Sequence, residues 1–224
     1  MQFDLTLVFF IEIQYLRKPK AEKDLSGNEL TFANICLSSI NILSGLSSNS
    51  KLRNMGIQGI KVASVDVDKL LGMLNAALSE EWLAYYQYWI GARLMEGPMR
   101  SEVEPELLLH ADQELNHAIL VVNRIIQLGG TPVINPTEWT KLARCSYDEP
   151  SDPYIEIILE QNLKGERCAI QRYQEIADFT NGKDHTTHQM AVTILNEEVE
   201  HENDIEDWIT DINRMKDEFK KIRL

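Results

Sequence analysis

Near its C-terminal end the chain reads Leu195-Asn-Glu-Glu-Val-Glu-His-Glu-Asn-Asp-Ile205. Glu198 and His201 stand three residues apart in this segment, and apolar residues on both sides recur at alternating steps of three and four. That period marks one face of an amphipathic helix. The two polar residues therefore occupy core positions of a stripe whose other members are Ala191, Ile194, Ile205, Trp208, Ile212, Met215 and Phe219.

Burial of an unpartnered carboxylate and imidazole costs several kcal/mol, so this stripe needs a compensating partner. A metal ion would compensate both groups at once. The same arrangement occurs a second time, as Glu114-Leu-Asn-His117, within another amphipathic segment. Two Glu-x-x-His pairs on two helices are a far more specific signal than either pair alone.

Similar apolar stripes predict four long helices, separated by proline, glycine and asparagine turn signals. The third helix opens at Asp152-Pro153, which we interpret as an N-cap followed by proline in the first helical position. The fourth contains no glycine or proline before Leu224. The predicted ranges are 66–95, 101–128, 152–181 and 184–224.

The lengths of the connections predict the topology. The first and third links are short turns, so the helices that they join are antiparallel neighbours. Residues 131–152 have three prolines and no sustained period. A connection of about 22 residues extends up to ~75 Å, whereas a helix of about 28 residues is ~42 Å long. We therefore predict an all-α, ferritin-like four-helix bundle with one long crossover.

Each predicted helix places one glutamate in its own core stripe, and the second and fourth add a histidine. One such glutamate is usually a misjudged boundary or a buried ion pair, and a lone histidine is usually a hydrogen-bonded core residue. The conjunction on four helices is typical of dimetal carboxylate bundles. Carboxylates neutralise and bridge divalent ions, and imidazole suits iron. We expect two iron ions, with manganese as an alternative, bound by Glu81, Glu114, His117, Glu166, Glu198 and His201.

Other polar and aromatic residues near these positions have weaker interpretations. His110 lies one turn before Glu114, and we expect it to support a ligand or to bind iron on its way into the site, without belonging to the dimetal ligand set. His185 and His188 resemble solvated residues at a helix start. Three tyrosines are more often core packing than redox participants: Tyr85, Tyr88 and Tyr173.

Composition excludes several classes of protein. The net charge is −13 and the pI about 4.8, which oppose nucleic-acid binding because that needs a basic face. The same charge suits a surface that attracts cations. No apolar run reaches the ~18 residues of a membrane span. The nearest, residues 5–16, contains Glu12 and follows Asp4 where a signal peptide has basic residues. We expect a cytoplasmic protein without a membrane partner.

Residues 1–54 differ from the remainder. They combine an apolar opening, a charged patch and a tract rich in serine and asparagine, without a sustained period. Such tracts are usually linker or disorder, and Met55 is a possible start codon. We therefore assign 1–54 to a leader that is disordered or absent from the mature protein, and 55–224 to the ferritin-like domain.

Three motifs resemble those of bacterioferritins: Glu81-Trp-Leu-Ala-Tyr-Tyr-Gln-Tyr-Trp89, Glu114-Leu-Asn-His117 and Glu198-Val-Glu-His201. The resemblance covers roughly residues 64–212 and implies a ferroxidase centre formed by the six ligands named above. Bacterioferritins that bind haem have methionine immediately after the second helix's glutamate. Leu115 stands there in this chain, so we expect no haem. The family also ends in a short fifth helix, whereas the fourth helix here is predicted to continue.

The cysteines are too few and too scattered for a disulfide framework or a four-cysteine zinc site. Cys168 follows Glu166 by two residues, about 200° around its helix, and Cys145 lies in the crossover, so the two thiols could meet outside the bundle. The layout resembles the Dps-like subclass called thioferritins, which implies a dodecameric cage that oxidises iron with hydrogen peroxide. The alternative is two unrelated buried thiols. Under the thioferritin interpretation, Cys145 and Cys168 form a reversible disulfide and act as a redox pair.

The leading functional hypothesis is a cage that oxidises and stores iron, uses hydrogen peroxide or dioxygen, and protects against oxidative stress. One alternative is a dimetal peroxidase without storage, like rubrerythrin, although no Cys-x-x-Cys pairs are present to hold a rubredoxin iron. A second is a DNA-sheltering Dps protein, which the acidic composition opposes. Size-exclusion chromatography distinguishes a cage from a dimer, and a gel shift detects DNA binding.

We predict that a chain beginning at Met55 assembles and melts like the full chain, because no periodic apolar pattern precedes that residue. Thermal unfolding compares the stability of the two chains, and size-exclusion chromatography checks whether each of them assembles. A loss of several kcal/mol on truncation would show instead that the leader packs against the bundle.

Overall fold

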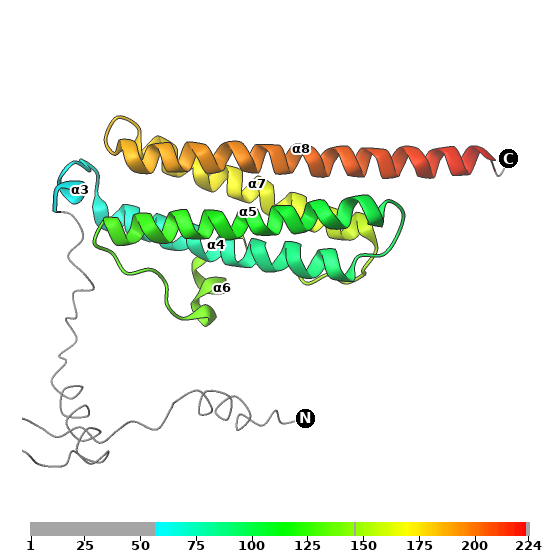
Figure 1. The fold of residues 1–224 in the computed structure, drawn as a ribbon, viewed down its shortest axis with the longest axis horizontal. Helices are drawn as coiled ribbons and strands as arrows, with labels where there is room; N and C mark the ends of the chain where they lie inside the picture. The colour runs from blue at the N-terminus through cyan, green and yellow to red at the C-terminus, as the bar shows by residue number, and fades with distance from the viewer. Residues whose placement is uncertain (1–56, 146, 223–224) are drawn as a thin grey trace, which may run out of the picture. The chain divides into compact units, whose positions relative to one another are not determined.

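Four long helices form the bundle in the computed structural model, which describes residues 57–145 and 147–222. The assignment of residues 1–54 to a leader lies outside the described residues. Figure 1 shows the helices side by side, and the observed ranges lie within a few residues of the predicted ones. They are α4 (Val67–Leu94), α5 (Arg100–Gln127), α7 (Ile155–Thr180) and α8 (His185–Ile222).

Local signals explain where α4 and α5 begin and end. The Asp66 side chain accepts a hydrogen bond from the backbone N–H of Lys69 at 3.0 Å, which caps α4. Gly97 then adopts a φ of +126° in the turn to α5, a conformation that favours glycine. Gly129, with φ +80°, follows the end of α5.

The predicted start of the third helix at Asp152-Pro153 is wrong. The N-cap of α7 is Tyr154, and the Asp152 side chain accepts a hydrogen bond from the Tyr154 N–H at 2.9 Å. The backbone here pairs with the end of α4: Glu96 N–H donates to the Pro153 carbonyl at 2.7 Å, and Ile155 N–H donates to the Glu96 carbonyl at 2.8 Å. This extended pairing prevents helix formation before Ile155.

The crossover between α5 and α7 contains two short helices that the sequence analysis did not predict, η2 (Pro136–Glu138) and α6 (Trp139–Leu142). Helix α6 packs against α4, where the Trp139 ring stacks on Trp82 with 5.4 Å between centroids. The Asn75 side chain of α4 also bonds to the Thr131 carbonyl and the Val133 N–H. A further short helix, α3 (Ile57–Lys61), precedes α4.

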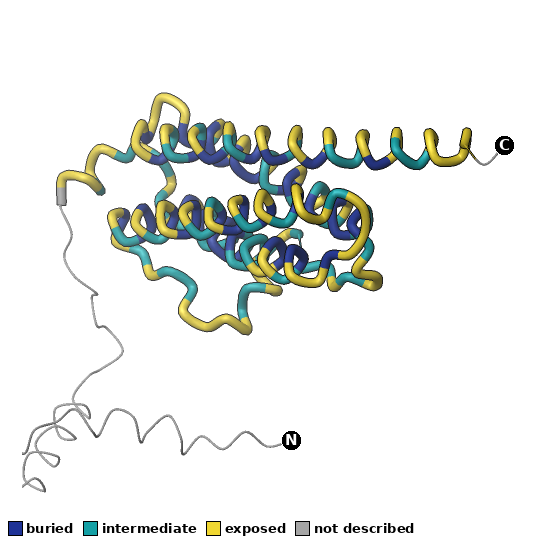
Figure 2. Tube along the Cα trace, turned by 45° about the vertical axis from the view of Figure 1, so that its right-hand side comes forward, coloured by how far each residue is buried: buried dark blue, intermediate teal, exposed yellow. Residues whose placement is uncertain are grey.

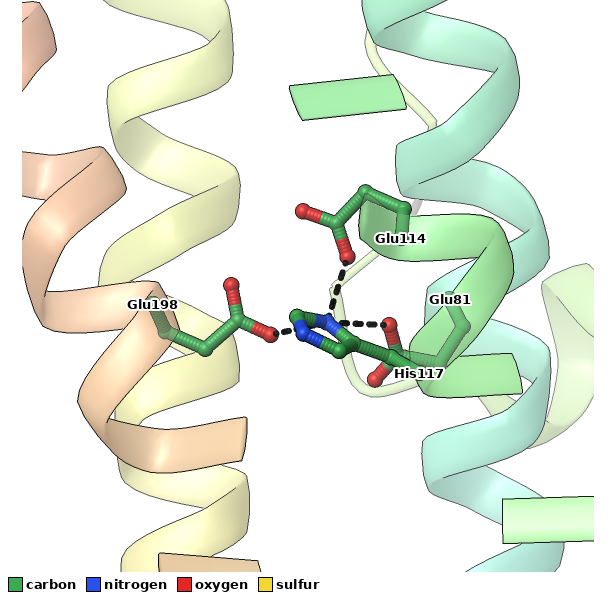
Figure 3. Close-up of side chains that lie close together, drawn as sticks. All are labelled: Glu81, Glu114, His117 and Glu198. Carbon is green, nitrogen blue, oxygen red and sulfur yellow. Dashed lines mark hydrogen bonds and ion pairs between the residues drawn. The ribbon is translucent and has the colours of Figure 1, made fainter. Parts of the chain in front are cut away.

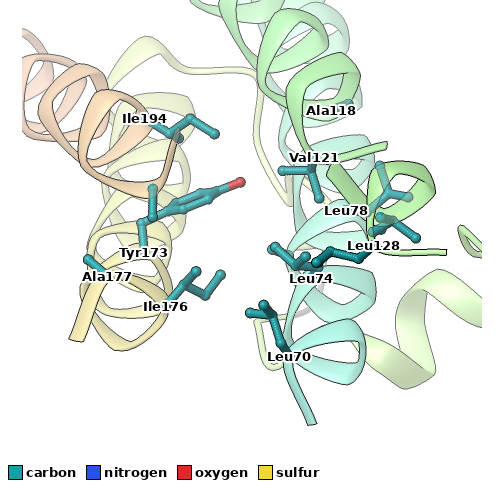
Figure 4. Close-up of a cluster of buried hydrophobic side chains, with 13 residues drawn as sticks. Leu70, Leu74, Leu78, Ala118, Val121, Leu128, Tyr173, Ile176, Ala177 and Ile194 are labelled. Carbon is teal, nitrogen blue, oxygen red and sulfur yellow. The ribbon is translucent and has the colours of Figure 1, made fainter. Parts of the chain in front are cut away.

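Two apolar clusters fill the bundle, with a polar layer between them. One contains Leu70, Leu74, Val121, Tyr173 and Ile194, whose side chains face one another across the helices in Figure 4. The other lies toward the opposite end and includes Tyr88, Leu107 and Ile205. Burial of both clusters supplies the main driving force that holds the four helices together.

A buried ion pair fixes the turn between α7 and α8. Arg124, near the end of α5, donates to both carboxylate oxygens of Asp184 at 2.9 and 2.7 Å, and to the Thr187 hydroxyl at 2.6 Å. Asp184 also accepts from the Thr187 N–H in the first turn of α8. The side chains of Arg124 and Asp184 are 5% and 1% exposed, so each compensates the buried charge of the other.

Helix α8 is continuous to Ile222, as predicted, and its last turns extend beyond the other three helices (Figures 1 and 2). The stripe predicted for its core face is buried only as far as Ile212. Phe219 is 68% exposed, which corrects its assignment to the core. Its position in the period was right, but no other described helix reaches that level.

Among the described residues, every helix is too short or too polar to cross a membrane.

Candidate metal centre

The six predicted ligands meet in the polar layer between the two apolar clusters. All are at most 3% exposed. They come from all four long helices: Glu81 from α4, Glu114 and His117 from α5, Glu166 from α7, and Glu198 and His201 from α8. In Figure 3 the ring of His117 lies between Glu198 on one side and Glu81 and Glu114 on the other.

Two overlapping sets of ligand atoms form within this layer. The first is Glu81, Glu114, His117 and Glu198, and the second is Glu114, Glu166, Glu198 and His201. One ligand atom per residue within each set lies within 4.8 Å of the others. Glu114 and Glu198 belong to both sets, so the geometry offers two neighbouring metal positions with two bridging carboxylates.

Each histidine directs Nδ1 into this layer. His117 Nδ1 lies 3.1 Å from Glu198, 3.3 Å from Glu114 and 3.5 Å from Glu81. His201 Nδ1 lies 3.4 Å from both Glu114 and Glu198, and 3.6 Å from Glu166. Two ligands that are each ~2.1 Å from one ion lie about 3–3.6 Å apart, which agrees with these separations.

Several inward-facing atoms have no hydrogen-bond partner within the described part of the chain. They are Glu114 Oε1, Glu166 Oε2, both carboxylate oxygens of Glu198, and His201 Nδ1. Buried polar atoms are nearly always satisfied, and here the orphaned atoms all come from carboxylates and an imidazole. A pair of divalent ions fits this donor set, because it would satisfy these atoms together.

Two tyrosines hold the outer glutamates. The Tyr173 hydroxyl of α7 donates to Glu81 of α4, and the Tyr88 hydroxyl of α4 donates to Glu166 of α7. Both tyrosines are buried in the apolar clusters, as predicted. The helical period gives no sign of this bonding role, which fixes one oxygen of each carboxylate and leaves the other facing the polar layer. Tyr85, only partly buried, packs against the second cluster.

The outer nitrogens of the histidines also have partners that the sequence analysis missed. His117 Nε2 donates to the Glu197 carboxylate at 2.7 Å, and His201 Nε2 donates to the Gln113 amide oxygen at 3.1 Å. Such contacts fix the orientation of a metal-binding ring and raise its basicity. Glu197 and Gln113 lie at partly exposed helix positions, where the sequence offers no signal to distinguish them from ordinary surface residues.

The cluster holds protons in the buried layer. Burial raises the pKa of Glu81 and that of Glu166 well above the usual glutamate value. Burial opposes the charge of His201, but the surrounding carboxylates outweigh it and raise the pKa of this imidazole to about 12. The pKa of His117 is raised for the same reason. Protonated imidazoles therefore balance part of the carboxylate charge.

The three remaining histidines lie outside this cluster. His110 is buried one turn before Glu114, stacks on His201 with 4.1 Å between ring centroids, and belongs to neither ligand set. Burial, followed by the charge of His201, lowers the pKa of His110 to about 4. His185 is exposed as predicted. His188 is half-buried and lies 2.9 Å from the Ala177 carbonyl, so its assignment as solvated is only partly correct.

Cys145 of the crossover and Cys168 of α7 form a disulfide, with their Cα atoms 6.4 Å apart. A cavity of about 200 Å³ lies between this disulfide and the metal-facing layer. Its lining includes both cysteines together with Glu81, Glu114 and Glu166. The prediction that the two thiols meet is confirmed. Their expected place outside the bundle is wrong, because Cys168 is buried and the disulfide shares a cavity with three predicted ligands.

Hydrogen bonds and ion pairs hold the crossover in place beside this cavity. Glu80, next to the ligand Glu81, accepts hydrogen bonds from the Arg144 N–H at 2.7 Å and from the Arg172 side chain at 2.8 Å. Lys164 pairs with Asp148 at 2.9 Å. The polypeptide beside the disulfide is therefore tied to α4 and α7 by contacts that do not depend on the sulfur–sulfur bond.

The family model of the ferritin-like domain matches residues 71–215, a range that includes all six predicted ligands. The chain belongs to the ferritin-like family. Its resemblance to bacterioferritins and to the thioferritin subclass is supported by individual relatives. The bacterioferritin of Rhodobacter capsulatus is 29% identical over 111 residues, which cover 50% of this chain and 63% of that protein.

Two other ferritin-like relatives match more of the chain. The bacterioferritin-related protein of Bacteroides fragilis, described as a dodecameric thioferritin, has a solved structure that is 54% identical. Its match covers 73% of this chain and 99% of that one, with a TM-score of 0.72. The DNA protection during starvation protein of Pyrococcus furiosus is 37% identical over 155 residues, which cover 67% of this chain and 82% of that protein.

We predict that the affinity of the centre for Co²⁺ rises with pH. His201, with a pKa of about 12, holds a proton at neutral pH and must release it to bind a metal ion, as must the protonated glutamates. Affinity should therefore increase by up to about tenfold per pH unit for each proton released. Calorimetric titration at about pH 6, 7 and 8, in buffers of different ionisation enthalpy, measures both affinity and proton release.

The His201→Ala variant should release fewer protons on binding than the unchanged protein. Affinity that is independent of pH, with no proton release in either buffer, would contradict the assigned protonation.

Proposed function

We propose that this protein oxidises Fe²⁺ at the dimetal centre with hydrogen peroxide, or with dioxygen, and stores the Fe³⁺ product inside a cage of identical chains. The observation that supports this most directly is the pair of overlapping ligand sets with Glu114 and Glu198 in common. Bridging carboxylates hold two metal ions close enough to act on one oxidant molecule.

The proposed ligands divide into two halves that have the same residue types. Glu81 and His117 would hold one Fe²⁺, and Glu166 and His201 the other, with Glu114 and Glu198 between them. The four negative charges of the carboxylates balance the four positive charges of two divalent ions. Burial of the two ions is therefore tolerable. Manganese suits the same ligands, so it remains the alternative metal.

The oxidation of two Fe²⁺ ions by one hydrogen peroxide molecule balances in electrons, oxygen atoms and protons. Each Fe²⁺ gives one electron to hydrogen peroxide, the O–O bond breaks, and two protons complete two water molecules. These two protons come from solvent, because the buried histidines and glutamates release their own protons when they bind the metal ions. The use of peroxide in this way consumes a toxic oxidant, so a protective role against oxidative stress follows. A reducing cytoplasm, where Fe²⁺ persists, suits this chemistry.

Assembly into a dodecameric cage is proposed from the relative in Bacteroides fragilis, which is described as dodecameric and aligns over nearly its whole length. Exposed large apolar side chains on α4 and α5, such as Trp89, Leu109 and Ile119, give surface that association would bury. A dimetal peroxidase without storage is the second candidate, because the ligand geometry alone is equally compatible with it.

The proposed role of Cys145 and Cys168 is to exchange electrons with the oxidant chemistry nearby. The shared cavity and the disulfide support it. An external thiol would reduce the disulfide to two thiols, and peroxide would then oxidise the thiols back, with release of two water molecules. In a reducing compartment, a bond of this kind is more often a redox device than a structural staple.

We predict that changing both Glu114 and Glu198 to alanine reduces the rate of Fe²⁺ oxidation about 100-fold or more, because both bridging ligands are lost. The bundle should remain helical by circular dichroism. Stopped-flow absorbance measures the oxidation, and electron microscopy after iron loading shows whether a mineral core forms within a shell.

The matched control changes Glu106 and Glu218, exposed residues of α5 and α8, to alanine. It removes the same charge and should retain the rate of the unchanged protein. Full activity in the Glu114/Glu198 variant would refute the ligand assignment, and oxidation without a mineral-filled shell would favour the non-storage peroxidase.

The chain has a third cysteine, Cys36, which we change to serine so that only Cys145 and Cys168 are counted. We predict that thiol counting on this Cys36→Ser variant gives two thiols after reduction and none after peroxide. The bond closes a loop with a sequence separation of 23, for which chain entropy gives ~3 kcal/mol of stabilisation. Oxidised protein should therefore melt at a higher temperature than reduced protein, and Cys145→Ser should abolish the difference. Two thiols that persist after peroxide treatment would exclude the redox pair.

A further inference from the structure

The two cysteines of the disulfide differ in their access to solvent. Cys168 lies in α7 and is 7% exposed, whereas Cys145 lies in the crossover and is half-buried. Both line the cavity of about 200 Å³ that also reaches Glu81, Glu114 and Glu166. An external thiolate must reach a sulfur atom in order to attack it. Access therefore favours attack at Cys145.

Gly165 is a helix-interior glycine of α7 that lines the same cavity. It lies three residues before Cys168, so the two residues share one face of the helix. Glycine destabilises a helix interior relative to alanine, and it often marks a close contact. Gly91 of α4 is such a case, because an added Cβ would lie 3.0 Å from the Ile158 side chain.

Close packing does not explain the glycine at position 165. Outside its own helix, an added Cβ there would meet one atom of the described residues within 4 Å, Gln87 Nε2 at 3.7 Å. That separation is an ordinary van der Waals contact, so alanine would fit. What a side chain at Gly165 would remove is open space beside the disulfide.

The crossover on either side of Cys145 is bonded to α4 independently of the disulfide. The Arg144 N–H donates to the Glu80 carboxylate at 2.7 Å, and the Asp148 N–H donates to the Gln87 side-chain oxygen at 3.1 Å. These bonds persist when the sulfur–sulfur bond is broken, so the two thiols stay near one another. The cavity therefore keeps its shape through a cycle of reduction and oxidation.

We propose that a low-molecular-weight thiol enters this cavity and attacks the Cys145 sulfur, and that Gly165 supplies the space for it. A recess with room for several water molecules admits a molecule of a few heavy atoms. A protein dithiol, by contrast, needs a target sulfur that its broad surface can contact. This inference rests on the proposed redox role of the cysteine pair, and it names the reductant, the attacked sulfur and the residue that admits the reductant.

The exchange balances in atoms and electrons. The electron pair of the small thiolate forms a bond to the Cys145 sulfur, and the pair of the original bond leaves with the Cys168 sulfur, which takes a proton from solvent. A second small thiolate attacks the first and departs with it as a disulfide, and the Cys145 sulfur takes the second proton. Two small thiols are thus oxidised to one disulfide, while the protein disulfide is reduced to two thiols.

Trapping identifies the attacked sulfur. Full-length Cys36→Ser protein, oxidised and without added iron, is exposed briefly to β-mercaptoethanol, quenched with acid and alkylated. Peptide mass spectrometry should find the mixed disulfide on Cys145 and the alkyl group on Cys168. In this background, the thiol left by Cys168→Ser should react with dithiobis(nitrobenzoate) at least about tenfold faster than the thiol left by Cys145→Ser. A mixed disulfide on Cys168, or equal rates, would overturn the inference.

Substitution of Gly165 tests the role of the open space. Gly165→Ala should slow reduction by β-mercaptoethanol several-fold, and Gly165→Leu at least about tenfold, because each narrows the approach to the sulfur. The unfolding temperature of Gly165→Ala should nevertheless be unchanged or higher, because alanine favours a helix. Gly72→Ala makes the same change at an exposed position of α4 where an added Cβ meets no described atom within 4 Å, and it should leave the rate unchanged.

Two results would contradict the proposed reductant. Unchanged rates in both Gly165 variants would show that the open space has no part in reduction, and reduction by thioredoxin but not by β-mercaptoethanol would show that the reductant is a protein. Either result overturns this inference and leaves the iron chemistry of the dimetal centre intact. Failure of peroxide to re-form the disulfide would instead refute the redox role on which the inference rests.

Discussion

The structure depends on the cost of burying six ionisable side chains in the centre of a helical bundle. Each is at most 3% exposed. A buried charge without a partner destabilises the fold by far more than one buried apolar contact stabilises it. The chain meets this cost in three ways. Imidazolium and carboxylate groups compensate one another, buried tyrosines bond the outer carboxylates, and polar residues at the seam bond the outer histidine nitrogens.

Residues outside the polar layer supply the stability of the bundle. Apolar clusters on both sides hold the helices in place, so the ligands do not need to provide the stability of the bundle. The buried Arg124–Asp184 pair fixes the turn at one end, and the pairing of Glu96 with Pro153 and Ile155 fixes the other. The six clustered side chains are thus positioned by rigid elements, as a metal site would require.

The apolar stripes allowed the fold and the six clustered residues to be predicted from sequence, because helical period and burial are coupled. Features that depend on tertiary contact were missed. Helix α6 is held by stacking of Trp139 on Trp82, and no local pattern announces such a contact. Phe219 continues a correct period past the point where neighbouring helices end. Gln113 and Glu197 look like surface residues until the histidines beside them are placed.

The two halves of the centre are alike in their ligands but differ in what stands behind them. His117 is backed by a carboxylate, Glu197, whereas His201 is backed by a neutral amide, Gln113. A carboxylate makes its imidazole the stronger electron donor. A metal ion bound beside His117 would therefore be held more firmly than one bound beside His201, and the ion beside His201 would exchange more readily.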